Sequence, residues 1–523
     1  MRKQIITLAG AAITSELMAI LIVLISFGYI ISAESGLGKK GNIMPLASSA
    51  NINDNTSNTK DKNIYDIQAD IIFSGNTVFD NYTNKKAILK ETVKLDFKQI
   101  KDSTIILYVP SVNAAKTIIK KLNIIYIKNN KQYNLPINNW NFENMILKLY
   151  LSQKDISLIN ASSSFTNTNN TNNNNTNFFY LCIDYEIILN ERSSTIFYDD
   201  NEIYLTNFLI TPAIFKDDAQ LTVYKTDFGD PYIYNTNNYR ITFRTNENIE
   251  IYAPGIKEEM FLKNINNASI NRITLLEKKS STRLLSQQPS AIENVSKITI
   301  FTALNLRDFP TVIINNNNLS STIAKNNIHM EKINDTEIWF INSEMTSKHV
   351  KDAFLLASEK IGEYPFKQLF VVRAQIPLKG MEFSNMIFIS DICFNKNLYN
   401  EDSFAGVVYH EVFHQWFYGI IGTDQLNEPF MDEGIVNYLS MKLKGDKLGN
   451  NFNNKFFKMV LRDYKTKEQY YDLVYKDAAI YFANIHRKLG DDFYKLLNII
   501  YNEKKFSILY YDEFLQYLSR FTN

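Results

Sequence analysis

Two of the five histidines in this chain, His410 and His414, stand on either side of Glu411 in the string YHEVFHQW. With so few histidines, the pattern H-E-x-x-H is expected by chance only about 0.003 times, so the match is specific. Residues four apart on a helix lie on the same face, and both imidazoles can therefore reach one metal ion. Glu411, the residue after the first histidine, then points at the open coordination position of the metal ion. Metal-assisted hydrolysis by water requires this spacing.

A catalytic zinc ion needs a third protein ligand, and Glu433 follows His414 after eighteen intervening residues, in EPFMDEGIVNYLS. Pro429 is typical of a helix start. The spacing allows the first helix to end, turn and return antiparallel, with Glu433 in the first turn of the second helix. We therefore expect one zinc ion per chain, held by His410, His414 and Glu433.

The residues alone leave one alternative open for these three side chains. The histidines can be a pair of satisfied core imidazoles, and Glu433 an exposed charge near a helix N-terminus, where its sign suits the helix dipole. The rarity of the chance match argues against this alternative.

The same stretch resembles the zinc metallopeptidases of the aminopeptidase N type, gluzincins related to membrane alanyl aminopeptidase, whose signature is H-E-x-x-H, eighteen residues and Glu. The resemblance runs through HEVFHQWFYGIIGTDQLNEPFMDEGIVNYLS, including the Gln-Trp after the second histidine. Upstream, LRDFP (306–310), EYPF (363–366) and GMEF (380–383) fall in the order of that family's catalytic domain. The TDFGDPYIYN segment of the first half resembles, less specifically, the family's N-terminal saddle domain.

The resemblance implies further site residues. Gly380, Met381 and Glu382 look like the family's substrate-binding G-x-M-E-N strand, in which the glutamate accepts the substrate's free α-ammonium group. The sequence departs from that pattern directly after Glu382, and the alternative is a carboxylate at a strand edge. Tyr475 opens YKDAAIYFANIHRKLG, which resembles the family's Y-x-K-G helix without its glycine. There the tyrosine hydroxyl stabilises the oxyanion, and the alternative is a tyrosine packed in the core.

These residues together predict hydrolysis of a peptide bond. Zinc supplies the Lewis acid, Glu411 takes a proton from water and passes it to the leaving amine, and Tyr475 stabilises the oxyanion. No G-x-S-x-G elbow, Walker A motif or dinucleotide fingerprint indicates another chemistry.

The elements that must position this chemistry fall into two halves. Period-two alternation recurs from Ile64 to about Asn305, as in Tyr239, Ile241 and Phe243, and predicts a β-rich N-terminal domain. Within it, the low-complexity insert 162–177 is interpreted as a disordered loop. From 306 to 523, short apolar runs alternate with helical patterns, beginning with a helix over 347–361. We expect a multidomain protein with an antiparallel, saddle-like β domain followed by an α+β, thermolysin-like catalytic domain.

The start of the chain is interpreted as a targeting segment. Arg2 and Lys3 precede a mostly apolar stretch from Ile5 to Ala33, which fits an uncleaved membrane anchor or a signal peptide cut before Glu34. A buried N-terminal helix is the third possibility. The polar stretch that completes residues 34–63 is expected to be a flexible tether. The predicted location is the cell membrane, single-pass with the catalytic domain outside the cytoplasm, or the secreted state if the segment is cleaved.

Length and composition exclude several classes of protein. A chain of 523 residues is too long for one ordinary core, and 45% hydrophobic residues argue against a disordered protein. The net charge of +1 provides no global field that would attract nucleic acid. Cys182 and Cys393 are far apart in the chain, with no Cys or His neighbour at metal-ligand spacing, and are expected to be unpaired thiols.

Three functions remain open. The favoured one is an exported zinc aminopeptidase that acts on peptide substrates. The second is an endopeptidase or altered hydrolase on the same zinc site, because the chain ends about 90 residues after Glu433 and resembles a short form without the family's large C-terminal helical domain. The third is a catalytically idle surface-binding protein.

Overall fold

The computed structural model describes residues 65–522 except 74–85, 110–115, 129–130, 161–177, 192–195, 200–201, 217–218, 222, 224–227, 231–232, 262–294 and 317–326. The expected targeting segment, the tether and the loop 162–177 lie outside the described residues. Within the described part of the chain, no helix is both long and apolar enough to cross a membrane.

Regular alternation of buried and partly exposed side chains builds the largest sheet of the described residues. In β16 (Asn237–Thr245), the expected inward residues Tyr239, Ile241 and Phe243 are all buried. The sheet has eight strands in the order β18 (Ile256–Phe261), β19 (Lys297–Leu306), β16, β1 (Tyr65–Phe73), β2 (Lys86–Asp96), β9 (Phe178–Ile188), β5 (Lys116–Lys128) and β6 (Lys131–Pro136). The pairing of β1 with β16 is parallel, so the sheet is mixed and not purely antiparallel as expected.

Smaller elements complete the first half. One sheet contains β13 (Thr211–Pro212), β4 (Thr104–Tyr108), β8 (Ile146–Tyr150) and β7 (Trp140–Glu143), with β3 (Ile100–Lys101) paired to β4. The remaining elements are the hairpin of β14 (Phe215–Lys216) and β15 (Ala219–Gln220) and the helix α2 (Gln153–Asn160).

A five-stranded sheet forms a middle layer and is buried on both faces. Its order is β10 (Asn190–Glu191), β11 (Ile196–Asp199), β12 (Glu202–Leu205), β20 (Thr311–Asn315) and β17 (Ile249–Tyr252). In β20, Ile313 packs into the core of the first half, whereas Val312 and Ile314 pack into a second cluster on the other face. The sheet of the first half therefore includes a strand that lies beyond the expected boundary at residue 305.

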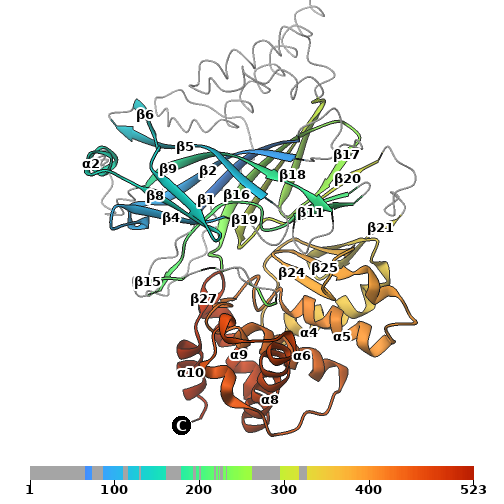
Figure 1. Ribbon diagram of the computed structural model, residues 1–523. Helices are drawn as coiled ribbons and strands as arrows, with labels where there is room; N and C mark the ends of the chain where they lie inside the picture. The colour runs from blue at the N-terminus through green and yellow to red at the C-terminus, as the bar shows by residue number, and fades with distance from the viewer. Residues whose placement is uncertain are drawn as a thin grey trace, which may run out of the picture. The chain divides into compact units, whose positions relative to one another are not determined.

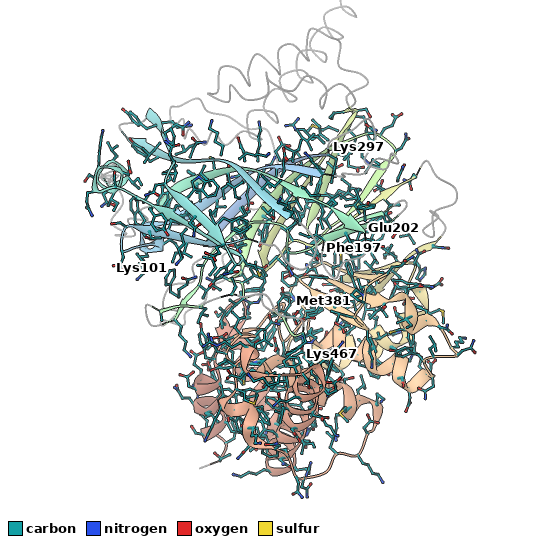
Figure 2. All side chains as sticks on the ribbon, viewed as in Figure 1. Lys101, Phe197, Glu202, Lys297, Met381 and Lys467 are labelled. Atoms are coloured by element: carbon teal, nitrogen blue, oxygen red, sulfur yellow. The ribbon has the colours of Figure 1, made fainter. Side chains whose placement is uncertain are left out.

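The second half begins with a sheet whose strands are ordered β21 (Ile328–Ile333), β22 (Thr336–Ile341), β23 (Gln368–Ala374), β25 (Met386–Ser390) and β24 (Gly380–Phe383). One face packs against the middle sheet, where Phe197 and Met381, both labelled in Figure 2, belong to the same cluster. The other face packs against helices through residues such as Leu369 and Val371. β24 is the edge strand, and its partner β25 runs antiparallel to it.

Helices dominate the remainder of the chain (Figure 1). They are α4 (Ser347–Lys360), α5 (Glu401–Phe413), α6 (Phe430–Lys444), α7 (Lys467–Tyr470), the π-helix η10 (Tyr471–Asp477), α8 (Ala478–Leu489), α9 (Asp492–Lys504) and α10 (Tyr511–Ser519). The short strands β26 (Gly422–Thr423) and β27 (Ile508–Leu509) pair in parallel. The sequence predicts α4 to within one residue, and it also predicts the start of α6 next to Pro429.

Candidate metal centre and active site

Two helices bring the predicted metal ligands together. His410 lies in the last turn of α5, His414 caps its C-terminus, and Glu433 lies in the first turn of α6. The Nε2 atoms of the histidines are 3.1 Å apart, and Glu433 Oε2 lies 3.2 Å from His410 Nε2 and 3.4 Å from His414 Nε2. Three ligand atoms thus converge on one point, and the set of two imidazoles and one carboxylate suits zinc.

The surroundings of His414 support metal binding. Its Nδ1 lies 3.0 Å from the backbone carbonyl oxygen of Phe417, so Nδ1 carries the proton and Nε2 is left free to coordinate. Burial disfavours the charged form of His414, but the carboxylates of Glu382, Glu433 and Glu411 outweigh burial and raise its pKa. This concentration of negative charge is the environment in which a divalent cation is stable.

The expected general base lies beside the edge strand β24. Glu411 is 5% exposed, and its Oε2 has no hydrogen-bond partner among the described residues. Its side chain lies directly against Gly380, where a Cβ atom would overlap Oε1, Cδ and Cγ of the glutamate. Burial raises the pKa of Glu411, and the charge of Glu382 raises it further.

The structure also places the predicted substrate-binding strand. Glu382 is 5% exposed, its Oε1 has no hydrogen-bond partner among the described residues, and burial raises its pKa to about 7. Although β24 is an edge strand, the carboxylate is therefore buried, unlike the exposed strand-edge group considered from sequence. Met381 points away from the metal ligands into the core between the two sheets.

Tyr475 lies at the metal cluster. Its hydroxyl donates a 2.5 Å hydrogen bond to Glu433 Oε1, and its ring stacks on His410 with centroids 5.6 Å apart. The helix expected to begin at Tyr475 begins instead at Ala478, and Tyr475 belongs to the π-helix η10. Asn437 of α6 donates to the backbone carbonyl of Tyr475 over 2.8 Å, which ties this widened turn to the ligand helix.

Gln415, next to the second histidine, joins the zinc-ligand helix to β24. Its Oε1 accepts a 3.0 Å hydrogen bond from the backbone N–H of Asn385, and its Nε2 donates to the carbonyl of Phe383 over 3.0 Å. The hydroxyl of Tyr364 also donates to Gln415 Oε1. The side-chain amide of Gln415 thus hydrogen-bonds to backbone groups at the end of β24, the strand that carries Glu382.

Asp308 also links the end of β24 to the segment that follows α5. It accepts hydrogen bonds from the backbone N–H of Ser384 at 2.7 Å and from the Tyr418 hydroxyl at 2.5 Å. Sequence reading noted the motifs that contain Gln415 and Asp308 but assigned neither residue a role, because each acts through partners distant in the chain.

A third residue that sequence reading missed is Asp230, from the TDFGDPYIYN segment. The turn before it packs on the second half: the rings of Phe228 and Tyr470 are 5.3 Å apart, and a Cβ on Gly229 would lie 2.6 Å from Leu461 Cδ1. Burial raises the pKa of Asp230 well above its usual value, and the negative charges of Glu382 and Glu433 raise it further. The turn that carries Asp230 therefore packs on the helical half of the chain at Leu461 and Tyr470.

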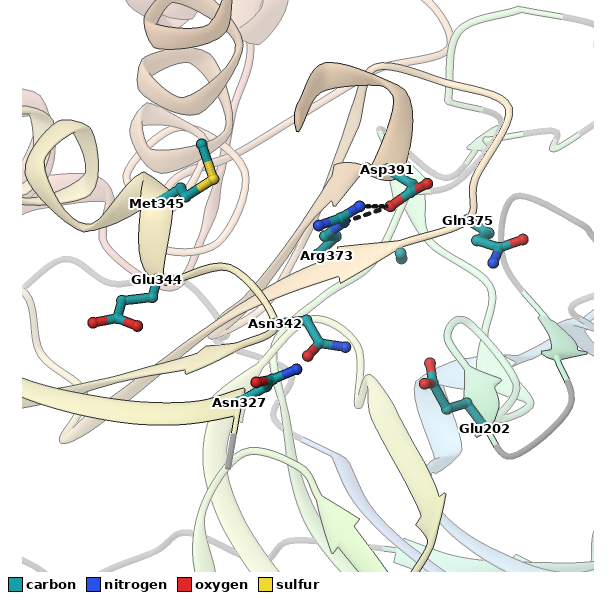
Figure 3. Close-up of a pocket in the computed structure, with 9 residues that line it drawn as sticks. Glu202, Asn327, Asn342, Glu344, Met345, Arg373, Gln375 and Asp391 are labelled. Carbon is teal, nitrogen blue, oxygen red and sulfur yellow. Dashed lines mark hydrogen bonds and ion pairs between the residues drawn. The ribbon is translucent and has the colours of Figure 1, made fainter. Parts of the chain in front are cut away.

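A cavity of about 290 Å³ lies elsewhere, at the carboxyl ends of β22, β23 and β25 (Figure 3). Its charged residues include Arg373, which forms an ion pair with Asp391, and Glu202, which accepts a hydrogen bond from Tyr204. None of the predicted site residues lines it. The predicted site residues therefore gather at α5, α6, η10 and β24, away from this cavity.

Residues 347–520 match the family model described as the peptidase family M1 domain. The matched range contains α4 to α10 and every residue that the sequence predicted for the site. No curated protein matches the chain.

Proposed function

We propose that this zinc metallopeptidase, which carries its peptidase family M1 domain at residues 347–520, is an aminopeptidase. The observation that carries the proposal is the buried carboxylate of Glu382, which stands on the edge strand beside the general base. Peptides with a free N-terminus are the proposed substrates.

A buried carboxylate without a full set of partners destabilises the free protein unless a ligand supplies the missing charge. Glu382 fits this description, because its Oε1 is buried without a hydrogen-bond partner among the described residues. The α-ammonium group of a peptide provides both positive charge and three N–H donors. With that group on Glu382, the first peptide bond of the substrate lies toward Gly380, which is two residues away on the same face of β24. Glu411 packs directly against Gly380.

His410, His414 and Glu433 are the residues that hold zinc. When bound, zinc supplies a Lewis acid that makes water more acidic and polarises the substrate carbonyl. Glu411 accepts the proton of the attacking water and delivers it to the leaving amine. Tyr475 donates a hydrogen bond to the developing oxyanion. To do so, its hydroxyl gives up its hydrogen bond to Glu433 Oε1 and donates to the substrate oxygen instead.

The two competing functions, endopeptidase and catalytically idle binding protein, do not explain particular features of the site. An endopeptidase does not need a partner for a substrate ammonium, so Glu382 would be buried without compensation. A catalytically idle binding protein has no use for a carboxylate beside three converging metal ligands.

The test compares amidocoumarin substrates with a free α-amine against the same substrates N-acetylated, with zinc measured on the same sample. We expect about one zinc per chain, loss of activity with chelators, and turnover confined to the free amines. Glu382→Ala should cost about 2–5 kcal/mol in kcat/KM on free-amine substrates, the range for removing one partner of a desolvated charge pair.

Two results would count against this assignment. Faster hydrolysis of N-acetylated or internally quenched peptides would favour the endopeptidase. An equal loss on both substrate types in Glu382→Ala would mean that Glu382 supports the structure of the site and does not bind the amine.

We also propose that the protein is exported and held at the outer face of the membrane by residues 5–33, or secreted if they are cleaved. The positive residues before the apolar stretch support this proposal. Protease treatment of intact cells should remove the catalytic half, whereas recovery of a protected cytosolic protein would contradict export.

A further inference from the structure

Both ends of Tyr475 are bonded to one face of the ligand helix α6. The hydroxyl donates to Glu433 Oε1 over 2.5 Å, and the backbone carbonyl accepts a hydrogen bond from Asn437 Nδ2 over 2.8 Å. Glu433 and Asn437 are four residues apart on α6, so they lie one helical turn apart on the same face. A metal ligand and a side-chain amide of the same helix therefore hold the two ends of one tyrosine.

The carbonyl of Tyr475 lies where the hydrogen-bond spacing of its helix changes. The π-helix η10 ends at Asp477, and α8 begins at Ala478. The N–H of Ala478 donates to the carbonyls of Leu473 and Tyr475. A carbonyl oxygen has two lone pairs, and Asn437 supplies the second donor. The bond from Asn437 is therefore an addition to the backbone bonds of this helix, and its loss leaves those bonds in place.

The same junction packs closely on α6. Gly434 follows the ligand Glu433, and a Cβ added to it would lie 2.6 Å from the Cβ of Ala478. The hydrogen bond from Asn437 is partly buried in this contact between α6 and α8. The position of the Tyr475 backbone relative to the metal ligand is therefore set within one turn of α6.

We infer that Asn437 is a positioning residue, which fixes the backbone of Tyr475 so that the hydroxyl meets the oxyanion. The inference rests on the proposed function, in which this hydroxyl leaves Glu433 Oε1 and donates to the substrate oxygen. The bond at the carbonyl is not part of that exchange, so the side chain turns about a fixed backbone. A preorganised donor is effective only at the position of the developing oxyanion, and a displacement of about 1 Å can cost about 100-fold in rate.

The experiment uses the full, zinc-loaded chain and the peptide substrate that it hydrolyses fastest. Asn437→Leu keeps a similar side-chain shape but cannot donate a hydrogen bond. We expect kcat to fall about tenfold or more, with KM and zinc per chain unchanged, because the change acts on the transition state and not on substrate binding. Tyr475→Phe, which removes the hydroxyl itself, should lower kcat about 100-fold or more.

A double-mutant cycle separates positioning from support of the fold. Adding Asn437→Leu to Tyr475→Phe should lower kcat by less than about twofold further, because the hydroxyl that Asn437 positions is already absent. A purely structural role predicts the same loss in both backgrounds. Asn498→Leu is the matched control, because Asn498 Nδ2 also donates to a backbone carbonyl, that of Ile361 at the end of α4, over 2.9 Å. It should leave kcat unchanged.

Binding of a phosphinic peptide provides a measurement that does not depend on turnover. The phosphinate presents a negatively charged oxygen to the site, as the transition state does. Calorimetry should show about tenfold weaker binding to Asn437→Leu than to the unmodified chain. In Tyr475→Phe protein, the same substitution should weaken binding by less than about twofold.

Unchanged kcat in Asn437→Leu would overturn the inference, and so would equal losses with and without the Tyr475 hydroxyl. If only N-acetylated or internally quenched peptides are hydrolysed, the aminopeptidase proposal fails, and the cycle on those peptides still decides the role of Asn437. If no peptide is hydrolysed, the phosphinate affinities decide it, and equal affinities in Asn437→Leu and the unmodified chain would reject it.

Discussion

At the scale of single residues, Gly380 shows how closely the site is packed. A Cβ at this position would overlap three side-chain atoms of Glu411. The requirement for glycine here is one of space, since no unusual backbone angle accompanies it. Glycine therefore allows Glu411, the proposed general base, to lie directly on the strand along which the substrate is proposed to bind.

Gly380→Ala should displace the Glu411 carboxylate while leaving the ligands on α5 and α6 untouched. We expect kcat to fall about 100-fold, the effect of misplacing a reacting group by about 1 Å, with zinc content unchanged. The measurement is turnover together with metal per chain. Gly449→Ala is the control, because nothing lies within 4 Å of the added methyl group. Full activity in Gly380→Ala would show that Glu411 is not the base in this position.

The convergence of the three proposed metal ligands could be predicted from sequence because it depends on one helix and the helix that follows it. His410 and His414 lie one helical turn apart, and Glu433 lies on the next helix. Gln415 and Asp308 could not be assigned in this way, since their partners Phe383 and Ser384 lie 32 and 76 residues away. Residue type alone does not indicate which distant backbone groups a side chain will bind.

At the scale of elements, period-two and period-3.6 patterns predicted the types of the main strands and helices but not the π-helix. The sequence YDLVYKD of η10 contains no signal that distinguishes it from an α-helix, because a π-turn differs only in its hydrogen-bond spacing. Tyr471 and Tyr475 both lie in this widened turn, and their ring centroids are 4.7 Å apart. The element that sequence reading missed is thus the one that carries the aromatic side of the site.

Strand β2 contains a buried acid in an otherwise apolar inward row. Glu91 is 1% exposed, and its Oε2 accepts hydrogen bonds from the Tyr185 hydroxyl at 2.6 Å and from the backbone N–H of Ile210 at 3.0 Å. Burial raises the pKa of Glu91 to about 8, although both hydrogen bonds oppose the shift. The folded protein therefore keeps this proton at pH values where the unfolded chain has lost it.

Because the folded pKa is the higher one, the free energy of unfolding should fall as the pH rises from about 4.5 to about 8, by on the order of 4 kcal/mol. Glu91→Gln keeps an oxygen acceptor for Tyr185 but cannot ionise, and it should flatten this part of the profile. Denaturant unfolding across that range checks the prediction. Glu258→Gln, at an exposed position of β18, serves as the control and should leave the slope unchanged. An unaltered slope in Glu91→Gln would assign the pH dependence to other groups.

At the scale of the whole molecule, one buried arginine joins three distant stretches of chain. Arg307 donates to the backbone carbonyls of Tyr234 at 2.7 Å, Tyr418 at 2.5 Å, Ile420 at 3.1 Å and Ser507 at 2.7 Å. Burial lowers its pKa only to about 10, so the guanidinium stays charged at neutral pH. The hydrogen bonds of one charged guanidinium therefore join the first half, the segment after the zinc-ligand helix and the end of the chain.

The sequence predicts a β-rich and a helix-rich half, but it does not show that residues of one half belong to the sheets and the core of the other. β20 pairs with β12 and β17 of the first half although it lies beyond residue 305. The helical core likewise includes Tyr108 and Tyr234 from the first half. Local periodicity identifies strands and helices, whereas packing between distant parts of the same chain depends on which faces meet in three dimensions.

Arg307→Met should destabilise the whole molecule and the metal site together. The variant leaves four carbonyls without their donor, and each acceptor that stays buried and unsatisfied costs about 1–3 kcal/mol. Since two of the carbonyls belong to the segment after α5, zinc affinity should fall in parallel with the free energy of unfolding. Denaturant unfolding and zinc titration of the same sample measure both. Arg373→Met, which breaks the partly exposed pair with Asp391, should cost less than about 1 kcal/mol and leave zinc affinity unchanged. If Arg307→Met lowered stability but bound zinc as tightly as the unmodified chain, the contact would hold the halves together without positioning the ligand helix.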